Sequence, residues 1–93
     1  MLNNGERKNL TGNKIKQLRI ERGMSQYDLV IKCELLGYPM TQNMISRIEN
    51  GKRYVTDIEI WVMMHVFRVT SASLFEECTG QEKEEVEQKI KHF

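Results

Sequence analysis

The segment over residues 41–53, TQNMISRIENGKR, constrains the fold most strongly, because its side chains separate into two faces when it is placed on a helix. Its apolar side chains share one face: Met44, Ile45 and Ile48. Its polar side chains share the other: Gln42, Asn43, Ser46, Arg47 and Asn50. Thr41 is a good N-cap, and Gly51 predicts where the helix ends. We therefore expect a short helix that buries one face and presents the other outward.

Capping signals divide the rest of the chain into four further helices. The expected N-caps are Thr11 or Asn13, Ser25 with Asp28, Thr56 with Glu59, and Thr70 or Ser71. Gly23 and Gly37 predict the ends of the first two helices. The β-branched stretch 62–69 also admits a strand, but the capping box before it and its length favour a helix. The predicted fold class is an all-α bundle of five helices.

Apolar side chains at helical spacing give the expected core. They are Ile15, Leu18 and Ile20 in the first helix, Leu29, Val30, Cys33 and Leu36 in the second, Ile58, Trp61, Val62, Met63, Met64, His65 and Phe67 in the fourth, and Leu74 and Phe75 in the fifth. Some of Trp61, Met63 and Met64 could instead line a dimer face. A chain of 93 residues that is 40% hydrophobic can build one core and not two.

Three parts are expected along the chain: a flexible N-terminal arm over residues 1–10, the helical domain over 11–78, and a C-terminal tail over 79–93. The tail begins with a capping-box pattern and carries a thin apolar stripe, formed by Val86, Ile90 and Phe93. It can form a short sixth helix if it packs against the domain or against a second copy of the chain.

The net charge of +1 conceals an uneven distribution. Residues 1–53 hold ten Lys and Arg against five acids, a net charge of +5, whereas residues 54–93 hold four against eight, a net charge of −4. A basic half joined to an acidic half suits a protein that presents one face to a polyanion. Chance clustering on a solvated surface is the alternative that charge alone leaves open.

Several classes of protein are not indicated. The sequence has no apolar run long enough for a transmembrane helix and no hydrophobic N-terminal signal, so we expect a cytoplasmic protein. Cys33 and Cys78 could form one disulfide, but a buried free thiol in a reducing cytosol is favoured. The two cysteines and two histidines lack zinc spacing, and no nucleophile elbow or phosphate loop is present. We expect neither an enzyme nor a cofactor.

The outward face of the 41–53 helix carries side chains that match the base edges in a DNA major groove. Arg47 offers a planar fork for guanine O6 and N7, and the amides of Gln42 and Asn43 can pair with adenine. Lys52 and Arg53, just past the helix, suit phosphates. The alternatives are an ordinary solvated helix face and a surface turn. The pattern favours double-stranded DNA as the partner.

Residues 14–77 resemble the Cro/cI-type helix-turn-helix domain (XRE-like) of phage repressors and their bacterial relatives, which has a lambda-repressor-like fold. The matching stretches are IKQLRIERGMSQYDL (15–29), MISRIENGKR (44–53), VTDIEIW (55–61) and VTSASLF (69–75). Their combination is specific, although any one of them alone would be a weak signal.

The resemblance implies a role for each matching position. It implies base reading by Gln42, Asn43, Ser46 and Arg47, and phosphate binding by Gln26, Thr41, Asn50, Lys52 and Arg53. Arg19 and Glu49 look like the family's ion pair between the first and third helices. Two departures stand out. The link over 34–40 is longer than usual, so the second helix should gain a turn, and Arg68 stands where Gly or Asn often ends the fourth helix.

The expected function is that of a sequence-specific, DNA-binding transcriptional regulator, a repressor that acts as a homodimer in a bacterial or phage-infected cell. The expected dimer surface comprises Phe75, Val86, Ile90 and Phe93. One alternative is an antitoxin or accessory DNA-binding protein whose tail binds a protein partner. Another is an interaction module that has kept the fold and lost DNA binding, which the intact polar face and the Lys52-Arg53 pair disfavour.

Overall fold

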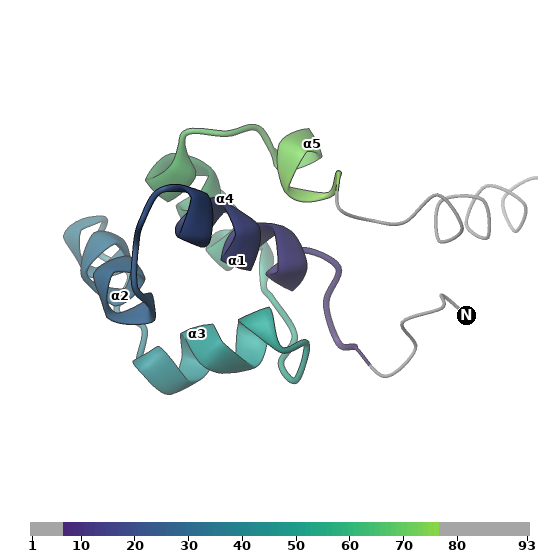
Figure 1. Ribbon diagram of the computed structural model, residues 1–93, viewed down its shortest axis with the longest axis horizontal. Coiled ribbons are helices and arrows are strands. Elements are labelled where there is room, and N and C mark those ends of the chain that lie inside the picture. Colours follow the sequence, from purple (N-terminus) through teal and green to yellow (C-terminus); the bar gives the residue numbers. More distant parts are fainter. Residues whose placement is uncertain (1–6, 77–93) are drawn as a thin grey trace, which may run out of the picture.

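The computed structural model describes residues 7–76, and these form five α-helices and no strand (Figure 1). The helices are α1 (Gly12–Glu21), α2 (Gln26–Leu35), α3 (Gln42–Glu49), α4 (Asp57–Phe67) and α5 (Ser71–Leu74). The predicted all-α fold class is therefore confirmed. The expected sixth helix, Cys78 and most of the predicted dimer surface lie outside the described residues. Within 7–76, no helix has the length and apolar character that crossing a bilayer requires.

Side-chain caps start four of the five helices at the predicted residues. Ser25, Thr41, Thr56 and Thr70 each accept a hydrogen bond from a backbone N–H three residues on. The first helix differs: Thr11 occupies its N-cap position, as one of the two predictions had it, but the expected side-chain cap is missing. Thr11 makes no side-chain cap bond, and Asn13 lies inside α1. The Asn9 Oδ1 atom accepts the Gly12 N–H at 2.8 Å instead, so a side chain from before the helix satisfies this donor.

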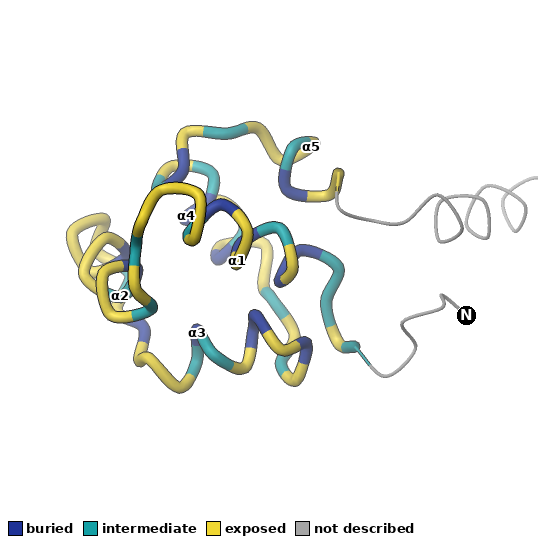
Figure 2. Tube along the Cα trace, viewed as in Figure 1, coloured by how far each residue is buried: buried dark blue, intermediate teal, exposed yellow. Residues whose placement is uncertain are grey.

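The core lies where all five helices meet (Figure 2). Its buried members are Ile15, Leu18, Leu29, Cys33, Met40, Ile45, Ile48, Val62, Met63, Phe67 and Leu74. Each helix contributes at least one of these residues, and Met40 comes from the link before α3. Because Ile45 and Ile48 are both fully buried, the apolar face of α3 is fixed against α1 and α2.

Several apolar residues that were predicted to be core are exposed. Ile20, Ile58 and Trp61 expose 58%, 57% and 54% of their surface, and Leu36 and Phe75 are exposed as well. In α4, Ile58, Trp61 and His65 follow one another at i, i+3 and i+7, and so share an outer side of the helix. Trp61 packs edge-on against His65 there, with 4.2 Å between ring centroids. A helix with apolar residues on every side gives no sequence signal for which side faces out.

The backbones of α1 and α3 approach each other closely at Gly12. A Cβ atom placed on Gly12 would lie 2.1 Å from the carbonyl oxygen of Ile48, so only glycine fits at this position. The first turn of α1 is therefore in direct contact with the C-terminal end of α3. This contact helps to set the orientation of α3 in the bundle.

The longer link between α2 and α3 is held to the domain at several points. α2 ends at Leu35, and the Tyr38 N–H closes it by donating to the Cys33 carbonyl at 3.0 Å, with Gly37 at φ 81° in between. Met40 is buried in the core, and α3 begins after the Thr41 cap. Residues 36–41 therefore form a connection that is anchored to the domain at both ends.

Cys33 is a buried free thiol in the core. Burial raises its pKa to about 11, and the negative charge of Glu59 adds to this shift. A thiol with such a pKa is almost entirely protonated at neutral pH, so Cys33 acts as a small apolar side chain rather than a reactive group.

α4 ends at a non-glycine residue in the left-handed conformation. Arg68 has φ 55° and ψ 48°, and it is the only non-glycine residue with a positive φ among those described. The Val69 N–H donates to the Met64 carbonyl at 3.0 Å and closes the helix. This conformation brings Cβ close to the following carbonyl, which costs about 1–2 kcal/mol in residues other than glycine.

Replacing Arg68 with glycine is expected to raise the free energy of unfolding by about 1 kcal/mol, because glycine adopts this conformation without the steric cost. Urea unfolding followed by circular dichroism measures the change. Arg68→Ala is the matched control, since it shortens the side chain but keeps Cβ. An alanine variant that gains as much as the glycine variant would show that the backbone conformation is not the source of the gain.

Candidate nucleic-acid interface

The polar face of α3 is open to solvent. Gln42, Asn43 and Arg47 are exposed, and Ser46 between them is half-buried. Asn50 and Lys52, at the end of the helix, are exposed too. In Figure 1, α3 lies along the lower edge of the domain with α1 above it, so no other described helix covers its outer side. The four residues predicted to read bases thus lie together on one accessible surface.

Hydrogen bonds within this face are long. Gln42 Nε2 donates to Gln26 Oε1 at 3.4 Å, Arg47 Nη2 donates to the Lys52 carbonyl at 3.3 Å, and Asn50 Nδ2 donates to Ser46 Oγ at 3.5 Å. Bonds near the upper limit of hydrogen-bond distance and in contact with water are weak. They can be exchanged for bonds to another polar surface at small cost.

Arg19 and Glu49 form the ion pair that the resemblance implies. Arg19 Nε and Nη2 donate to the two Glu49 oxygens at 2.7 and 3.0 Å, and Arg19 Nη1 donates to the Met24 carbonyl at 2.8 Å. The Glu49 side chain is 1% exposed and that of Arg19 is 11% exposed. The hydrogen bond to Glu49 raises the pKa of Arg19 above its ordinary value. This bidentate pair ties α1 to the C-terminal end of α3.

Gln26, at the start of α2, joins the same network. Its Nε2 atom donates to Glu49 Oε1 at 3.1 Å, while its Oε1 atom accepts from Gln42. The amide predicted to bind phosphate therefore also connects the buried Glu49 carboxylate to the first exposed residue of α3. The Thr41 side chain, also predicted to bind phosphate, likewise makes a hydrogen bond within the fold. Its hydroxyl oxygen accepts the Met44 N–H at 3.1 Å and so caps α3.

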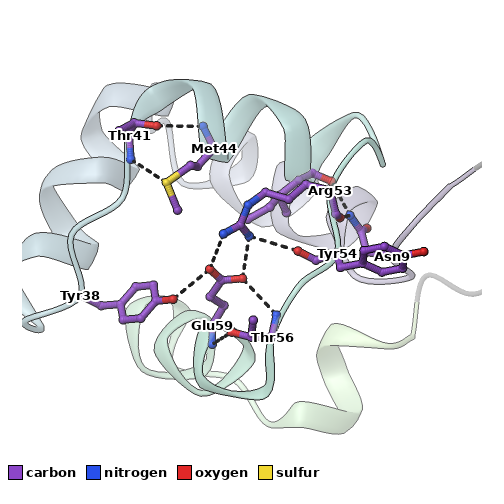
Figure 3. Close-up of polar contacts among 9 residues, drawn as sticks. Asn9, Tyr38, Thr41, Met44, Arg53, Tyr54, Thr56 and Glu59 are labelled. Carbon is purple, nitrogen blue, oxygen red and sulfur yellow. Dashed lines mark hydrogen bonds and ion pairs between the residues drawn. The ribbon is translucent and has the colours of Figure 1, made fainter.

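Arg53, for which a phosphate contact was predicted, forms an ion pair within the fold, and its side chain is 26% exposed. Its Nη1 and Nη2 atoms donate to the Glu59 oxygens at 2.7 and 2.8 Å (Figure 3). Both donor nitrogens on one side of the guanidinium are thus committed to a carboxylate that is completely buried. Arg53 is a structural residue in this geometry, and Lys52 is the exposed cation of the two.

Glu59 is the centre of a buried network that sequence reasoning missed. Besides Arg53, it accepts the Tyr38 hydroxyl at 2.9 Å and the Thr56 N–H at 3.0 Å (Figure 3). Burial of Glu59 raises its pKa, but the hydrogen bonds from Arg53, Thr56 and Tyr38 outweigh burial and hold the pKa below its ordinary value. The signal for this burial was the position of Glu59 among apolar neighbours in α4.

Residues 7–9, predicted to be part of a flexible arm, lie against the end of α3. The Lys8 N–H donates to the Gly51 carbonyl at 2.8 Å, and Arg7 Nη2 donates to the Glu49 carbonyl at 3.2 Å. Asn9 Nδ2 donates to the carbonyls of Ile48 and Arg53 at 3.0 and 2.8 Å. These bonds fix the segment to the last turn of α3 and to the loop that follows it.

The chain belongs to the helix-turn-helix family, because the model of that family matches residues 15–74. Two solved structures are similar. The restriction-modification controller protein C.AhdI from Aeromonas hydrophila is 23% identical, with a TM-score of 0.60, and the match covers 70% of this chain and 91% of that one. A point mutant of the restriction-modification controller protein C.Esp1396I is 26% identical, with a TM-score of 0.59 and coverage of 89% and 90%. No match was found among curated proteins.

The family and the exposed polar face of α3 together define the class of this protein. It is a DNA-binding transcriptional regulator. In the helix-turn-helix motif formed by α2 and α3, the second helix enters the major groove and the first crosses the DNA backbone.

Proposed function

We propose that the protein represses transcription in the cytoplasm by binding, as a homodimer, a two-fold symmetric operator whose bases are read by α3. The observation that carries this proposal is the division of α3 into two faces. Ile45 and Ile48 are fully buried, whereas Gln42, Asn43 and Arg47 are exposed on the opposite side. A helix held in this way can enter a groove without rearrangement of the domain.

The base-reading residues are Gln42, Asn43, Ser46 and Arg47. Arg47 is suited to guanine, since its planar fork matches O6 and N7, and the amides of Gln42 and Asn43 are suited to adenine. The half-buried hydroxyl of Ser46 can donate to or accept from a base edge. Each good bidentate pair would discriminate against a wrong base by about 1–3 kcal/mol.

Phosphate contacts from Gln26, Thr41, Asn50 and Lys52 would fix the register of α3 without reading sequence. Thr41 uses its oxygen as a cap acceptor, which leaves the hydroxyl hydrogen for a phosphate. Lys52 is exposed just beyond the end of α3. Arg53 is left out of this set because its guanidinium is bound to Glu59.

Two copies of the chain would bind the operator together. One small helix-turn-helix domain contacts too few base pairs to select a genomic site, whereas two half-sites about 34–36 Å apart double the contacts. The two-fold axis then sets the spacing and the relative orientation of the two half-sites. Phe75, which is 41% exposed at the end of α5, is the described member of the predicted dimer surface. The names of the two similar structures, both restriction-modification controller proteins, support a regulator of this size.

Replacing Arg47 with alanine is expected to remove discrimination at one base pair of each half-site, a loss of about 1–3 kcal/mol, or roughly fivefold to more than a hundredfold in specific affinity. The operator is first obtained by selection of bound duplexes from a random pool. Fluorescence titrations then compare operator, single-base variants and random duplex, and give the number of chains bound per duplex. Affinity for the random duplex should change little.

Lys52→Ala is the matched comparison, because it removes a phosphate contact rather than a base contact. Binding to operator and random duplex should weaken about equally. The slope of log affinity against log salt should fall by about 0.9, the amount that one phosphate contact contributes. The proposal fails if the Arg47 variant discriminates between bases as well as the parent does. Binding of one chain to each selected duplex would contradict the proposal that the protein binds as a homodimer.

A further inference from the structure

We propose that residues 7 and 8 form a second phosphate-binding edge beside the end of α3, which extends the DNA contact beyond the helix-turn-helix motif. The inference rests on the proposed function, since it assumes that α3 enters the groove. It assigns DNA backbone contacts to Arg7 and Lys8, two cations that lie before α1 in the chain and outside α2 and α3.

The segment has a defined position beside α3. Three residues in a row donate hydrogen bonds to carbonyls between Ile48 and Arg53: Arg7, Lys8 and Asn9. In Figure 1, the chain before α1 passes beside the end of α3 that leads toward α4. This segment lies more than forty residues before Gly51 in the sequence, so it is the fold that brings the two together.

The Arg7 side chain packs over Gly51. A Cβ on Gly51 would lie 2.7 Å from Arg7 Cζ and 2.9 Å from its Cγ and Nε, so the guanidinium lies directly over the glycine that follows α3. Gly51 has φ 73°, a conformation that also favours glycine. Arg7 is half-buried, and its Nη2 atom donates to the Glu49 carbonyl. A guanidinium carries five N–H donors, so the bond to the Glu49 carbonyl leaves others for a phosphate oxygen.

Lys8 is exposed beside Lys52. The bond from the Lys8 N–H to the Gly51 carbonyl places Lys8 next to the residue that precedes Lys52. The Lys8 Nζ atom lies 5.5 Å from the centroid of the exposed Tyr54 ring. Arg7 and Lys8 therefore bring two further cations to the end of α3, where Lys52 is exposed. Positive charge gathered on a surface attracts a polyanion such as DNA.

The DNA backbone is the partner that this position fits. The segment is bonded to the end of α3 and to the loop that follows it, and the exposed Lys52 of that loop is itself a proposed phosphate contact. A phosphate contact releases counterions, so each one changes the slope of log affinity against log salt by about 0.9. The segment can therefore be recognised by salt dependence even though it reads no sequence.

The test uses the full chain and compares Lys8→Gln with Lys32→Gln. Both variants remove one positive charge from an exposed lysine, but Lys32 lies near the end of α2 beside Leu36, His65 and Arg68, away from α3. Titrations of operator and random duplexes at several salt concentrations give affinities and slopes. Lys8→Gln should weaken both duplexes several-fold and reduce the slope by about 0.9, whereas Lys32→Gln should leave both unchanged.

Arg7 is tested by Arg7→Gln, which removes the charge, together with its thermal unfolding midpoint to show that the fold is retained. The slope should fall by about 0.9, and an unchanged slope in the folded variant would overturn the Arg7 contact. Equal behaviour of Lys8→Gln and Lys32→Gln, with the parent still discriminating operator from random DNA, overturns the inference and leaves the proposed function intact. A parent chain that does not bind either duplex overturns both. Loss of operator affinity alone, at an unchanged salt slope, also overturns the phosphate contact.

Discussion

Replacing Glu59 with alanine is expected to lower the free energy of unfolding by about 3–5 kcal/mol, because it leaves Arg53 partly buried without its partner. The same change removes the acceptor of the Tyr38 hydroxyl and of the Thr56 N–H. Three donors, from Arg53, Tyr38 and Thr56, thus lose the carboxylate that accepts their hydrogen bonds. Urea unfolding followed by circular dichroism measures the loss.

Two controls make this result specific. Asp57→Ala removes an exposed acid from the first turn of the same helix, and it should cost well under about 1 kcal/mol. Glu59→Gln keeps the shape and an acceptor oxygen but removes the charge, so its cost should lie between those of the two alanine variants. If Glu59→Ala is no more destabilising than Asp57→Ala, the network does not stabilise the fold.

The Glu59 network also predicts how stability depends on pH. The pKa of Glu59 is lower in the folded protein than its ordinary value, because hydrogen bonds from Arg53, Thr56 and Tyr38 exceed the opposing effect of burial. A carboxyl with a lowered folded pKa contributes its stabilisation above its unfolded pKa of about 4.3, and loses it as the pH falls through the folded value. The parent should therefore lose stability on acidification from about pH 5, and Glu59→Gln should lose less over the same range.

The second large effect is expected at Glu49. Glu49→Ala removes the bidentate partner of Arg19 and an acceptor of Gln26, and should cost about 3–5 kcal/mol because a nearly buried guanidinium is left unpaired. Glu21→Ala, which removes an exposed acid that accepts a hydrogen bond from Gln17, is the control and should cost about a few tenths of a kcal/mol. Thermal and urea unfolding measure both.

A double variant, Arg19→Met with Glu49→Leu, separates the charge pair from simple packing. Removing both charges together should cost less than Glu49→Ala alone, because no unpaired charge stays buried. A double variant whose cost equals the sum of the two single changes would contradict an energetic coupling between these residues.

Local signals in the sequence predicted most of the helix boundaries and the two faces of α3. A Ser or Thr cap interacts with a backbone N–H three residues away, so the starts of α2, α3, α4 and α5 can be read from short patterns. The faces of α3 follow from its 3.6-residue period, which places Ile45 and Ile48 together. Both features depend on neighbours in the chain.

Features that depend on the packing of distant segments could not be predicted. Asn9 binds carbonyls 39 and 44 residues away, and nothing in its local sequence indicates them. The Arg53–Glu59 pair spans a loop, where no helical period aligns the two side chains. Trp61 is exposed although it lies in a mostly apolar helix, because the direction of such a helix is set by its neighbours. The sequence therefore suggested a phosphate role for Arg53 but gave no sign of its ion pair with Glu59.

The Tyr38 hydroxyl anchors the α2–α3 connection to a buried carboxylate, and Met40 enters the core two residues later. The starting point of the third helix is thus determined by these attachments and not by how many residues precede them. Insertions or deletions between Leu35 and Tyr38 should therefore leave the exposed side chains of α3 in place. Under the proposed function, changes of operator preference would accordingly arise from substitutions on the helix surface and not from changes in loop length.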